Sequence, residues 1–392
     1  MRQKGSLCLL LTGLLLYGFD VGLDIYVGIR YYQKEDYWWF GITIALVILP
    51  GIFVNILSLG ILSDGGEIFQ CLVCIFQLSV IQQYCEALKR WKIMNLDIGT
   101  SQPCNKDNYH TCDCEKCKSY FKKKKACAKD DINLALTRYI EAFAESAPQW
   151  CLQFYIMLRQ WSFPWITIAS TVFSVLSLAW SITAMERAVK IKDKPTITFP
   201  KSSLIVFSLW QLCILVSRLS AIVIFAYAFR SYVFIVIGIH WTALMVVMLI
   251  NKYHDENSDH CKTVTTVFIT SFPLLFHFSS FTSKRMFENL SEKKILNVIH
   301  YSIFFFENVI MVSFSVWYDP TSTPHIELLA KIVLPLVFGG FAIGLLFRAL
   351  YYNFFHTSKM EKANSNNNGN SNNNDQHNDE GTVSNNQCET AF

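Results

Sequence analysis

Residues 138–160 read RYIEAFAESAPQWCLQFYIMLRQ, a segment that is long enough to span a membrane and yet carries charged side chains within it. Glu141 and Glu145 are four residues apart and therefore share one face of a helix. Arg138 and Gln153 fall near the same stripe. Burying a carboxylate in hydrocarbon costs several kcal/mol unless it is paired, protonated or hydrated. We therefore predict that this helix faces protein or water inside the membrane.

The composition is that of a polytopic membrane protein. Of 392 residues, 52% are hydrophobic and only 16% are charged, and the mean hydropathy is +0.29. The hydrophobic core of a soluble globular protein could not bury so many apolar side chains. The N-terminus begins like a signal peptide, but no small-residue cleavage site follows its apolar run, so we interpret it as a retained first span. The expected fold class is an all-α polytopic membrane protein.

The positions of Lys and Arg decide which of ten apolar stretches cross the membrane. If all ten crossed, the basic links 122–125 and 190–201 would lie on opposite sides, against the positive-inside rule. We predict that residues 67–91, which are rich in glutamine, and residues 263–281, which Pro273 interrupts, are only partly inserted (re-entrant). The eight remaining transmembrane helices are predicted at residues 5–31, 37–63, 132–160, 163–189, 202–229, 232–250, 295–318 and 326–355.

The order of these stretches repeats, which predicts two pseudo-symmetric repeats. Each half contains two spans, one partly inserted helix and two further spans, and repeats of this kind commonly form a cleft between them. Both termini and the basic links are predicted to be cytosolic. The predicted units are an N-terminal membrane repeat (1–189) with a Cys/Lys-rich cytosolic insert (93–131), a cytosolic link (190–201), a C-terminal membrane repeat (202–355) and a disordered Asn-rich cytosolic tail (356–392).

Ionisable residues also occur within other predicted spans. Asp20 and Asp24 lie four residues apart in the first span, with Arg30 near its outer end. Arg218 lies near the middle of a later span, and Glu307 lies within another. Such residues either line a functional path or join helices as structural ion pairs. Because acids outnumber the deep bases, pairing leaves carboxylates over, which favours a polar track through the membrane.

Two pairs of glycines predict places where helices approach closely. Gly18 and Gly22 lie in the first span, and Gly340 and Gly344 lie in the last. Glycines four residues apart leave one face of a helix without side chains, so a neighbouring helix can pack closely against its backbone. We expect packing contacts at these positions, not chemistry.

The insert at residues 93–131 is unusual in its cysteines. Thiols clustered near a histidine have the composition of a site for a soft metal, but the spacing matches no known zinc finger. We prefer reduced cytosolic thiols, some of them palmitoylated, and predict no metal. The Lys run at 122–125 is expected to contact anionic lipid and not nucleic acid. The residues concerned are Cys104, His110, Cys112, Cys114, Cys117 and Cys127.

Several of these segments together resemble the XK-related family of phospholipid scramblases. They are ESAPQWCLQFYI within residues 138–160, YGFDVGLDIYVGIRYY in the first span, and LVSRLSAIVIFAYAF and IGIHW in the two spans after the basic link. The resemblance extends over residues 5–355. It implies eight spans, two partly inserted helices, two repeats, cytosolic termini and a place in the plasma membrane.

The same resemblance implies ATP-independent, bidirectional movement of phospholipids that exposes phosphatidylserine, typically after caspase cleavage in apoptosis. A headgroup cannot cross hydrocarbon unaided because its charges lose water, whereas a groove of acids and bases can carry it in steps. No covalent reaction is required, so we expect neither enzyme activity nor a cofactor. The candidate lipid pathway consists of Asp20, Asp24, Arg30, Glu141, Glu145, Arg218 and Glu307.

The tail departs from the family pattern because it contains no DxxD caspase site. Asp375 and Asp379 are the candidate cleavage positions. The expected partners are membrane phospholipids, a caspase, and either a single-span membrane protein or a second copy of the chain as a homodimer; no nucleic acid is expected. Two other classes remain open. They are an ion-coupled solute transporter, since paired carboxylates at membrane depth also couple ions, and a non-transporting scaffold for a lipid-transfer protein or another cytosolic partner.

Overall fold

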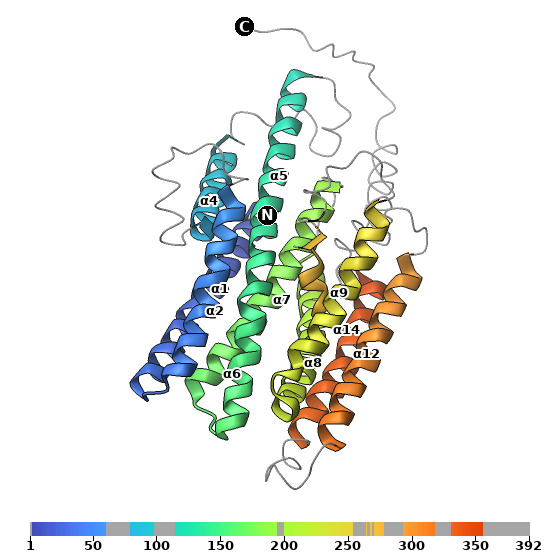
Figure 1. The fold of residues 1–392 in the computed structure, drawn as a ribbon. Coiled ribbons are helices and arrows are strands. Elements are labelled where there is room, and N and C mark those ends of the chain that lie inside the picture. Colours follow the sequence, from blue (N-terminus) through green and yellow to red (C-terminus); the bar gives the residue numbers. More distant parts are fainter. Residues whose placement is uncertain are drawn as a thin grey trace.

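The structure, a computed structural model, is a bundle of long helices that stand side by side (Figure 1). No strand occurs in the part of the chain that it describes, so the predicted all-α class is confirmed. The described residues are 2–59, 79–97, 114–193, 200–253, 264, 267–268, 270–277, 293–317 and 331–355.

Within these residues, seven helices are long and apolar enough to cross a membrane, which confirms a multi-pass membrane protein. They coincide with seven of the predicted spans. The other predicted span, residues 132–160, is divided between α5 (Glu115–Ala144) and α6 (Ser146–Gln160). The seven are α1 (Arg2–Gln33), α2 (Tyr37–Leu59), α7 (Trp165–Asp193), α8 (Lys201–Phe229), α9 (Tyr232–Tyr253), α12 (Lys293–Trp317) and Lys331–Phe354, which contains the π-helical turn η2 (Pro335–Gly339) and α14 (Gly340–Phe354).

The two stretches predicted to be partly inserted are described only in part. From residues 67–91 the structure describes the portion that begins α4 (Ser79–Asp97), and α4 is not among the seven apolar helices. From residues 263–281 it describes short pieces that include the single 3-10 turn η1 (Phe272–Leu275), where Pro273 stands in the first turn.

The segment of residues 138–160 bends at Glu145, where we predicted one unbroken helix. Pro148 causes the break, because it has no N–H for the carbonyl of Ala144 and its ring crowds that carbonyl. The neighbouring helical bonds persist: Glu145 N–H donates to the carbonyl of Glu141 at 2.8 Å, and Gln149 N–H donates to that of Glu145 at 3.0 Å. The prediction of a continuous helix was wrong, although the bend leaves both glutamates buried.

α7 and α8 form the centre of the bundle. In the most apolar segment of α7, and likewise of α8, 61% is buried inside the structure, against 17% for α1 and 11% for α9. Their side chains share the main hydrophobic core with those of α5, α6, α12 and α14. In Figure 1, α1 and α2 lie on one side of this centre, and α12 and α14 lie on the other. The outer helices expose large apolar side chains, such as Leu15 and Phe234, as lipid contact requires.

Three sharp reversals join helices at the lower end of the bundle (Figure 1). They follow α1, α6 and α8, and each contains a residue other than glycine with positive φ: Glu35 (63°), Trp161 (48°) and Arg230 (52°). Such a conformation is uncommon for these residue types, and here it reverses the chain within a few residues.

The glycine pair of the last span packs against α8, as predicted. A Cβ added at Gly344 would lie 2.7 Å from Cδ1 and 2.9 Å from Cγ1 of Ile214. One added at Gly340 would lie 3.2 Å from the carbonyl oxygen of Cys213. At the glycine pair of α1, in contrast, no neighbouring helix of the described part of the chain comes within 4 Å of such a Cβ, so the close contact predicted there is not found among these residues.

Gly344→Ala is expected to lower the free energy of unfolding by about 1–2 kcal/mol, because the added methyl group overpacks the contact between α14 and α8. The matched control is Gly339→Ala, since a Cβ at Gly339 meets no atom within 4 Å. Both variants are heated in detergent, and the monodisperse fraction is measured by size-exclusion chromatography. Equal midpoints for the two variants would contradict the packing argument.

Candidate functional site

Four acidic side chains meet inside the N-terminal half of the bundle. Asp20 and Asp24 come from α1, Glu141 from α5 and Glu145 from the bend, and each is at most 3% exposed. We call these four residues the acidic cluster. α1, α5 and α6 all pack against α7, which closes the cluster from the other side. The sequence predicted that Asp20 and Asp24 share one face of α1. In the structure this face points into the same interior as the two glutamates.

Hydroxyl and amide groups from α6 and α7 hold the two aspartates in place. Ser146 Oγ donates to Asp20 Oδ2 at 2.7 Å. Asp24 Oδ1 accepts from Gln153 Nε2 at 2.8 Å and from Ser170 Oγ at 2.5 Å. The short helix α6 therefore presents its first residue to one aspartate and a residue two turns later to the other.

The serines of α7 were missed by the sequence analysis. Ser170, Ser174, Ser177 and Ser181 recur at intervals of four, three and four residues, and each is at most 2% exposed. This spacing places them on one helix face, and small polar residues on one face of a span favour contacts between helices. The regular spacing of these serines in an apolar span was the available signal in the sequence.

Arg138 supplies positive charge next to the acidic cluster. Its guanidinium forms an ion pair with Glu141, and the two side chains are 5% and 3% exposed. Its Nη2 donates to Ser177 Oγ at 3.0 Å, and its guanidinium carbon lies 4.4 Å from the centroid of the Tyr17 ring. A single guanidinium cannot neutralise four carboxylates.

The acidic cluster retains polar atoms without a hydrogen-bond partner. Every member has one such buried oxygen, and so does the side chain of Gln149. An unpaired buried charge is expensive, so the excess must be carried by protons, water or a bound polar group. The oxygens concerned are Asp20 Oδ1, Asp24 Oδ2, Glu141 Oε1, Glu145 Oε1 and Gln149 Oε1.

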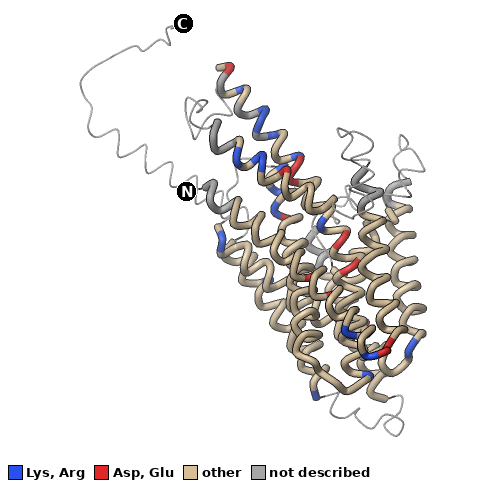
Figure 2. Tube along the Cα trace, turned by 90° about the vertical axis from the view of Figure 1, so that its left-hand side faces the viewer, with Lys and Arg blue, Asp and Glu red and all other residues tan. Residues whose placement is uncertain are grey.

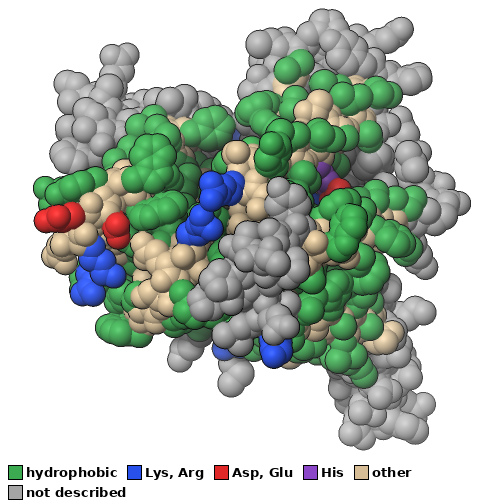
Figure 3. Space-filling view, turned by 60° about the horizontal axis from the view of Figure 1, so that its bottom comes forward, with side chains coloured by type: hydrophobic (Ala, Val, Ile, Leu, Met, Phe, Trp, Pro, Cys, Tyr) green, Lys and Arg blue, Asp and Glu red, His purple; other side chains and the backbone are tan. Residues whose placement is uncertain are grey.

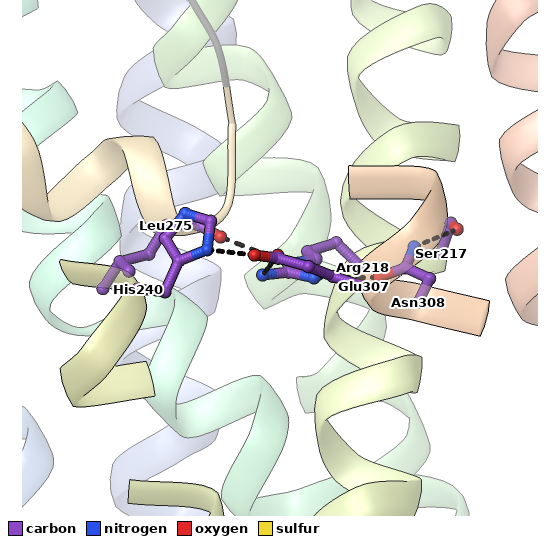
Figure 4. A network of polar contacts seen from close by, with 6 residues as sticks. All are labelled: Ser217, Arg218, His240, Leu275, Glu307 and Asn308. Atoms are coloured by element: carbon purple, nitrogen blue, oxygen red, sulfur yellow. Dashed lines mark hydrogen bonds and ion pairs between the residues drawn. The ribbon is translucent and has the colours of Figure 1, made fainter. Parts of the chain in front are cut away.

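A second polar network lies in the C-terminal half, around Arg218 on α8 (Figure 4). Arg218 Nη2 lies 2.6 Å from Glu307 Oε2, and Nη1 donates to Asn308 Oδ1 at 3.0 Å. Its Nε donates to the carbonyl of Leu275 in η1 at 3.3 Å. The guanidinium therefore joins α8, α12 and η1.

His240 and Ser217 extend this network, and we call Ser217, Arg218, His240, Glu307 and Asn308 the arginine cluster (Figure 4). His240 Nδ1 lies 2.5 Å from Glu307 Oε1, which adds α9. Asn308 Nδ2 donates to Ser217 Oγ at 3.3 Å, and Ser217 Oγ donates to a carbonyl of the turn η2 at 2.6 Å. His240, Asn308 and Ser217 were not predicted. A lone histidine in an apolar span was the available signal for the first.

The arginine cluster reaches the surface, unlike the acidic cluster. The side chain of Glu307 is 31% exposed and that of His240 is 11% exposed. Figure 3 shows a histidine and an acidic side chain in a hollow between hydrophobic side chains on the face viewed there.

The seven residues of the predicted lipid pathway thus lie in three places. Four form the acidic cluster, and Arg218 and Glu307 belong to the arginine cluster. Arg30 is exposed near the end of α1 and lines a separate cavity of about 360 Å³ with Lys34 and Gln160.

The tail and residues 98–113 of the Cys-rich insert lie outside the described residues. At its described edge, Cys114 Sγ caps α5 by accepting a hydrogen bond from Cys117 N–H at 3.4 Å. Across the described ranges no group of three or more His, Cys, Asp and Glu residues is placed to hold a metal ion. The candidate residues that fall outside are Cys104, His110, Cys112, Asp375 and Asp379.

A bundle of apolar helices with charged clusters in its interior defines an integral membrane protein with a polar core inside the membrane. Residues 8–357 match the XK-related protein family, and the chain therefore belongs to this family, which confirms the resemblance seen in the sequence. The match extends over nearly all of the described residues.

Curated relatives agree with this assignment. The chain is 22% identical over 370 residues to XK-related protein 8 of Tetraodon nigroviridis, which covers 88% of this chain and 81% of that protein. It is 22% identical over 366 residues to XK-related protein 8 of Pan troglodytes, with 86% and 81% covered. It is also 25% identical over 302 residues to Cell death abnormality protein 8 of Caenorhabditis briggsae, with 74% and 59% covered.

Proposed function

We propose that this protein is a phospholipid scramblase, which moves phospholipids in both directions between the leaflets and exposes phosphatidylserine at the plasma membrane during apoptosis. The observation that carries the proposal is the acidic cluster, because buried carboxylate oxygens without partners lie about halfway along the span of α1. Membership of the XK-related family supports the proposal, and so does the name of one relative, which refers to cell death.

The physical problem in scrambling is the headgroup, because its charges lose water in hydrocarbon. α1 separates two environments: most of its surface is exposed toward lipid, whereas Asp20 and Asp24 face the polar interior. Carboxylates, serine hydroxyls and glutamine amides can replace part of the water around an ammonium group. The acyl chains meanwhile remain in lipid, so only the headgroup needs a polar route.

The double variant Asp24→Asn/Glu145→Gln is expected to slow lipid flux about tenfold, which corresponds to about 1.4 kcal/mol of barrier. Neither residue forms an ion pair in the described part of the chain, so the substitutions remove charge and leave no unpaired base. Flux is measured in proteoliposomes with fluorescent phosphatidylcholine and external dithionite. The control is Glu35→Gln, an exposed acid that follows α1. Unchanged flux in a folded double variant would assign the acidic cluster to structure alone.

The proposed activity is tested directly with the full chain and with a chain that ends at Phe355. In the same liposomes, a scramblase lets dithionite bleach label that began in the inner leaflet, and removal of the predicted tail is expected to increase this fraction. Cleavage by a purified caspase at Asp375 or Asp379 is mapped by mass spectrometry. Inner-leaflet label that stays protected with both chains would contradict the scramblase proposal.

An ion-coupled solute transporter is the second candidate, because an excess of buried carboxyl groups is also how cation coupling is built. The two functions respond differently to a gradient. Lipid flux through a scramblase is unchanged when a sodium or proton gradient is imposed on the proteoliposomes. A transporter would instead dissipate the gradient faster than empty liposomes do, without moving the lipid label.

A further inference from the structure

A cavity lies between α1, α4, α5, α7 and α8. No member of the acidic cluster or the arginine cluster lines it, although Arg138, the ion-pair partner of Glu141, does. The empty space between its walls is about 750 Å³, including the part that is open to the outside. It lies near the start of α1 and α8 and near the end of α7, the end predicted to be cytosolic. Figure 2 shows Lys and Arg along the part of α5 that rises above the other helices at this end.

Arg187 on α7 brings a positive charge to this cavity. No hydrogen bond or ion pair joins its guanidinium to any residue in the described ranges. Arg138, which also lines the cavity, is instead engaged by Glu141 and Ser177. Arg187 therefore has donors that no described residue occupies, and the planar fork of a guanidinium suits the oxygens of a phosphate.

Asp131 on α5 lines the same cavity and carries the opposite charge. The charges of Asp131 and Arg187 influence each other, yet no ion pair within 4 Å joins them in the described part of the structure. The cavity thus presents a separated pair of charges. A ligand with both a negative and a positive group can satisfy both at once.

Two aromatic side chains, Tyr84 on α4 and Trp180 on α7, complete the polar end of the cavity. They pack closely against α1, because a Cβ added at Gly13 would lie 2.6 Å from the Tyr84 hydroxyl and 3.2 Å from Trp180 Nε1. Aromatic rings attract ammonium groups through the cation–π interaction. Leucines from α1, α5 and α8 line the rest and suit the glycerol end of a lipid.

We propose that this cavity binds the headgroup of a phospholipid that carries both a phosphate diester and an ammonium group. Arg187 binds the phosphate, and Asp131 with the rings of Tyr84 and Trp180 binds the ammonium. The inference rests on the proposed function, for which it supplies a headgroup site at the cytosolic end. It also names the substrate class: zwitterionic and serine phospholipids in preference to phospholipids without an amine.

The test is a binding titration of the full chain in detergent. The probes are dihexanoyl phosphatidylcholine, which has both groups, and dihexanoyl phosphatidylglycerol, which has only the phosphate. Arg187→Gln is expected to weaken binding of both probes about tenfold, because a charge-assisted contact is lost. Asp131→Asn is expected to weaken only the phosphatidylcholine, about fivefold. Glycerophosphocholine is added as a competitor that carries the headgroup without acyl chains.

The control is Lys192→Gln, which removes an exposed positive charge near the same end of α7. Equal weakening by Arg187→Gln and Lys192→Gln would overturn the inference, because the effect would then be one of general surface charge. Complete competition by glycerophosphocholine at the concentration of the lipid would also overturn it, in favour of a site for a soluble phosphodiester. Folding of each variant is checked by size-exclusion chromatography.

The titration involves no movement between leaflets, so it separates this inference from the scramblase proposal. A chain that binds as expected but leaves inner-leaflet label protected contradicts only the proposed function. A chain that scrambles while Arg187→Gln binds both probes normally contradicts only the headgroup site.

Discussion

Arg138→Met is expected to lower the free energy of unfolding by about 4 kcal/mol. Removing one partner of a buried ion pair leaves the other charge uncompensated, which costs about 3–5 kcal/mol. We expect more than the lower end of this range because Arg138 and Glu141 are both almost fully buried. The loss is aggravated by Asp20 and Glu145, since the same guanidinium charge acts on their carboxyl groups.

A second substitution distinguishes the lost charge from lost packing. Arg138→Met/Glu141→Gln removes both charges of the pair and keeps the side-chain volumes similar, so it is expected to recover most of the stability. Thermal midpoints of both variants and of the unmodified chain are measured in the same detergent. A double variant no more stable than Arg138→Met would show that the ion pair is not the source of the loss.

Arg218→Ala is expected to cost about 3 kcal/mol, the lower end of the range for a broken buried pair. The side chain of Glu307 is 31% exposed, so water screens the charge that is left behind. The substitution also removes the donors to Asn308 and to the carbonyl of Leu275, and the contact with the Phe304 ring at 4.7 Å. Because the arginine joins three elements, η1 is expected to loosen from α8.

The effect of Arg218→Ala is measured both at η1 and on the stability of the whole protein. Hydrogen–deuterium exchange of the peptide around residues 270–277 is expected to rise in Arg218→Ala, together with a lower thermal midpoint. Arg218→Met/Glu307→Gln removes the pair and should restore much of the midpoint, but it should not restore protection at η1, since the donor to Leu275 stays absent. Normal protection at η1 in Arg218→Ala would contradict its role as a joint.

The sequence predicted the membership of the acidic cluster because spacing along a helix fixes which side chains share a face. Asp20 with Asp24, and Glu141 with Glu145, were found in this way. Spacing does not reveal which helix lies opposite, however. The sequence therefore could not separate Arg218 and Glu307 from the acids of the first half, or place Arg30 at the exposed end of α1.

The neutral partners were harder to predict than the charges. Ser170 and Gln153 become significant only because Asp24 lies beside them, and that contact depends on how α1, α6 and α7 pack. The bend at Glu145 had a visible cause in Pro148. Proline is tolerated in many membrane helices where neighbours satisfy the released carbonyl, so its presence alone did not decide between a kink and a break.

The length of α5 connects its lysine-rich part to the acidic cluster. α5 is a continuous helix from Glu115 to Ala144, and at 1.5 Å per residue Lys125 lies about 24 Å from Glu141 along the axis. The lysine-bearing part of α5 and the residues next to Glu141 therefore belong to one uninterrupted helix, which ends at the break at Glu145. We expect that a sideways displacement of the lysine-bearing part of α5 would change the distance between Glu141 and α6, because the two helices meet at this break.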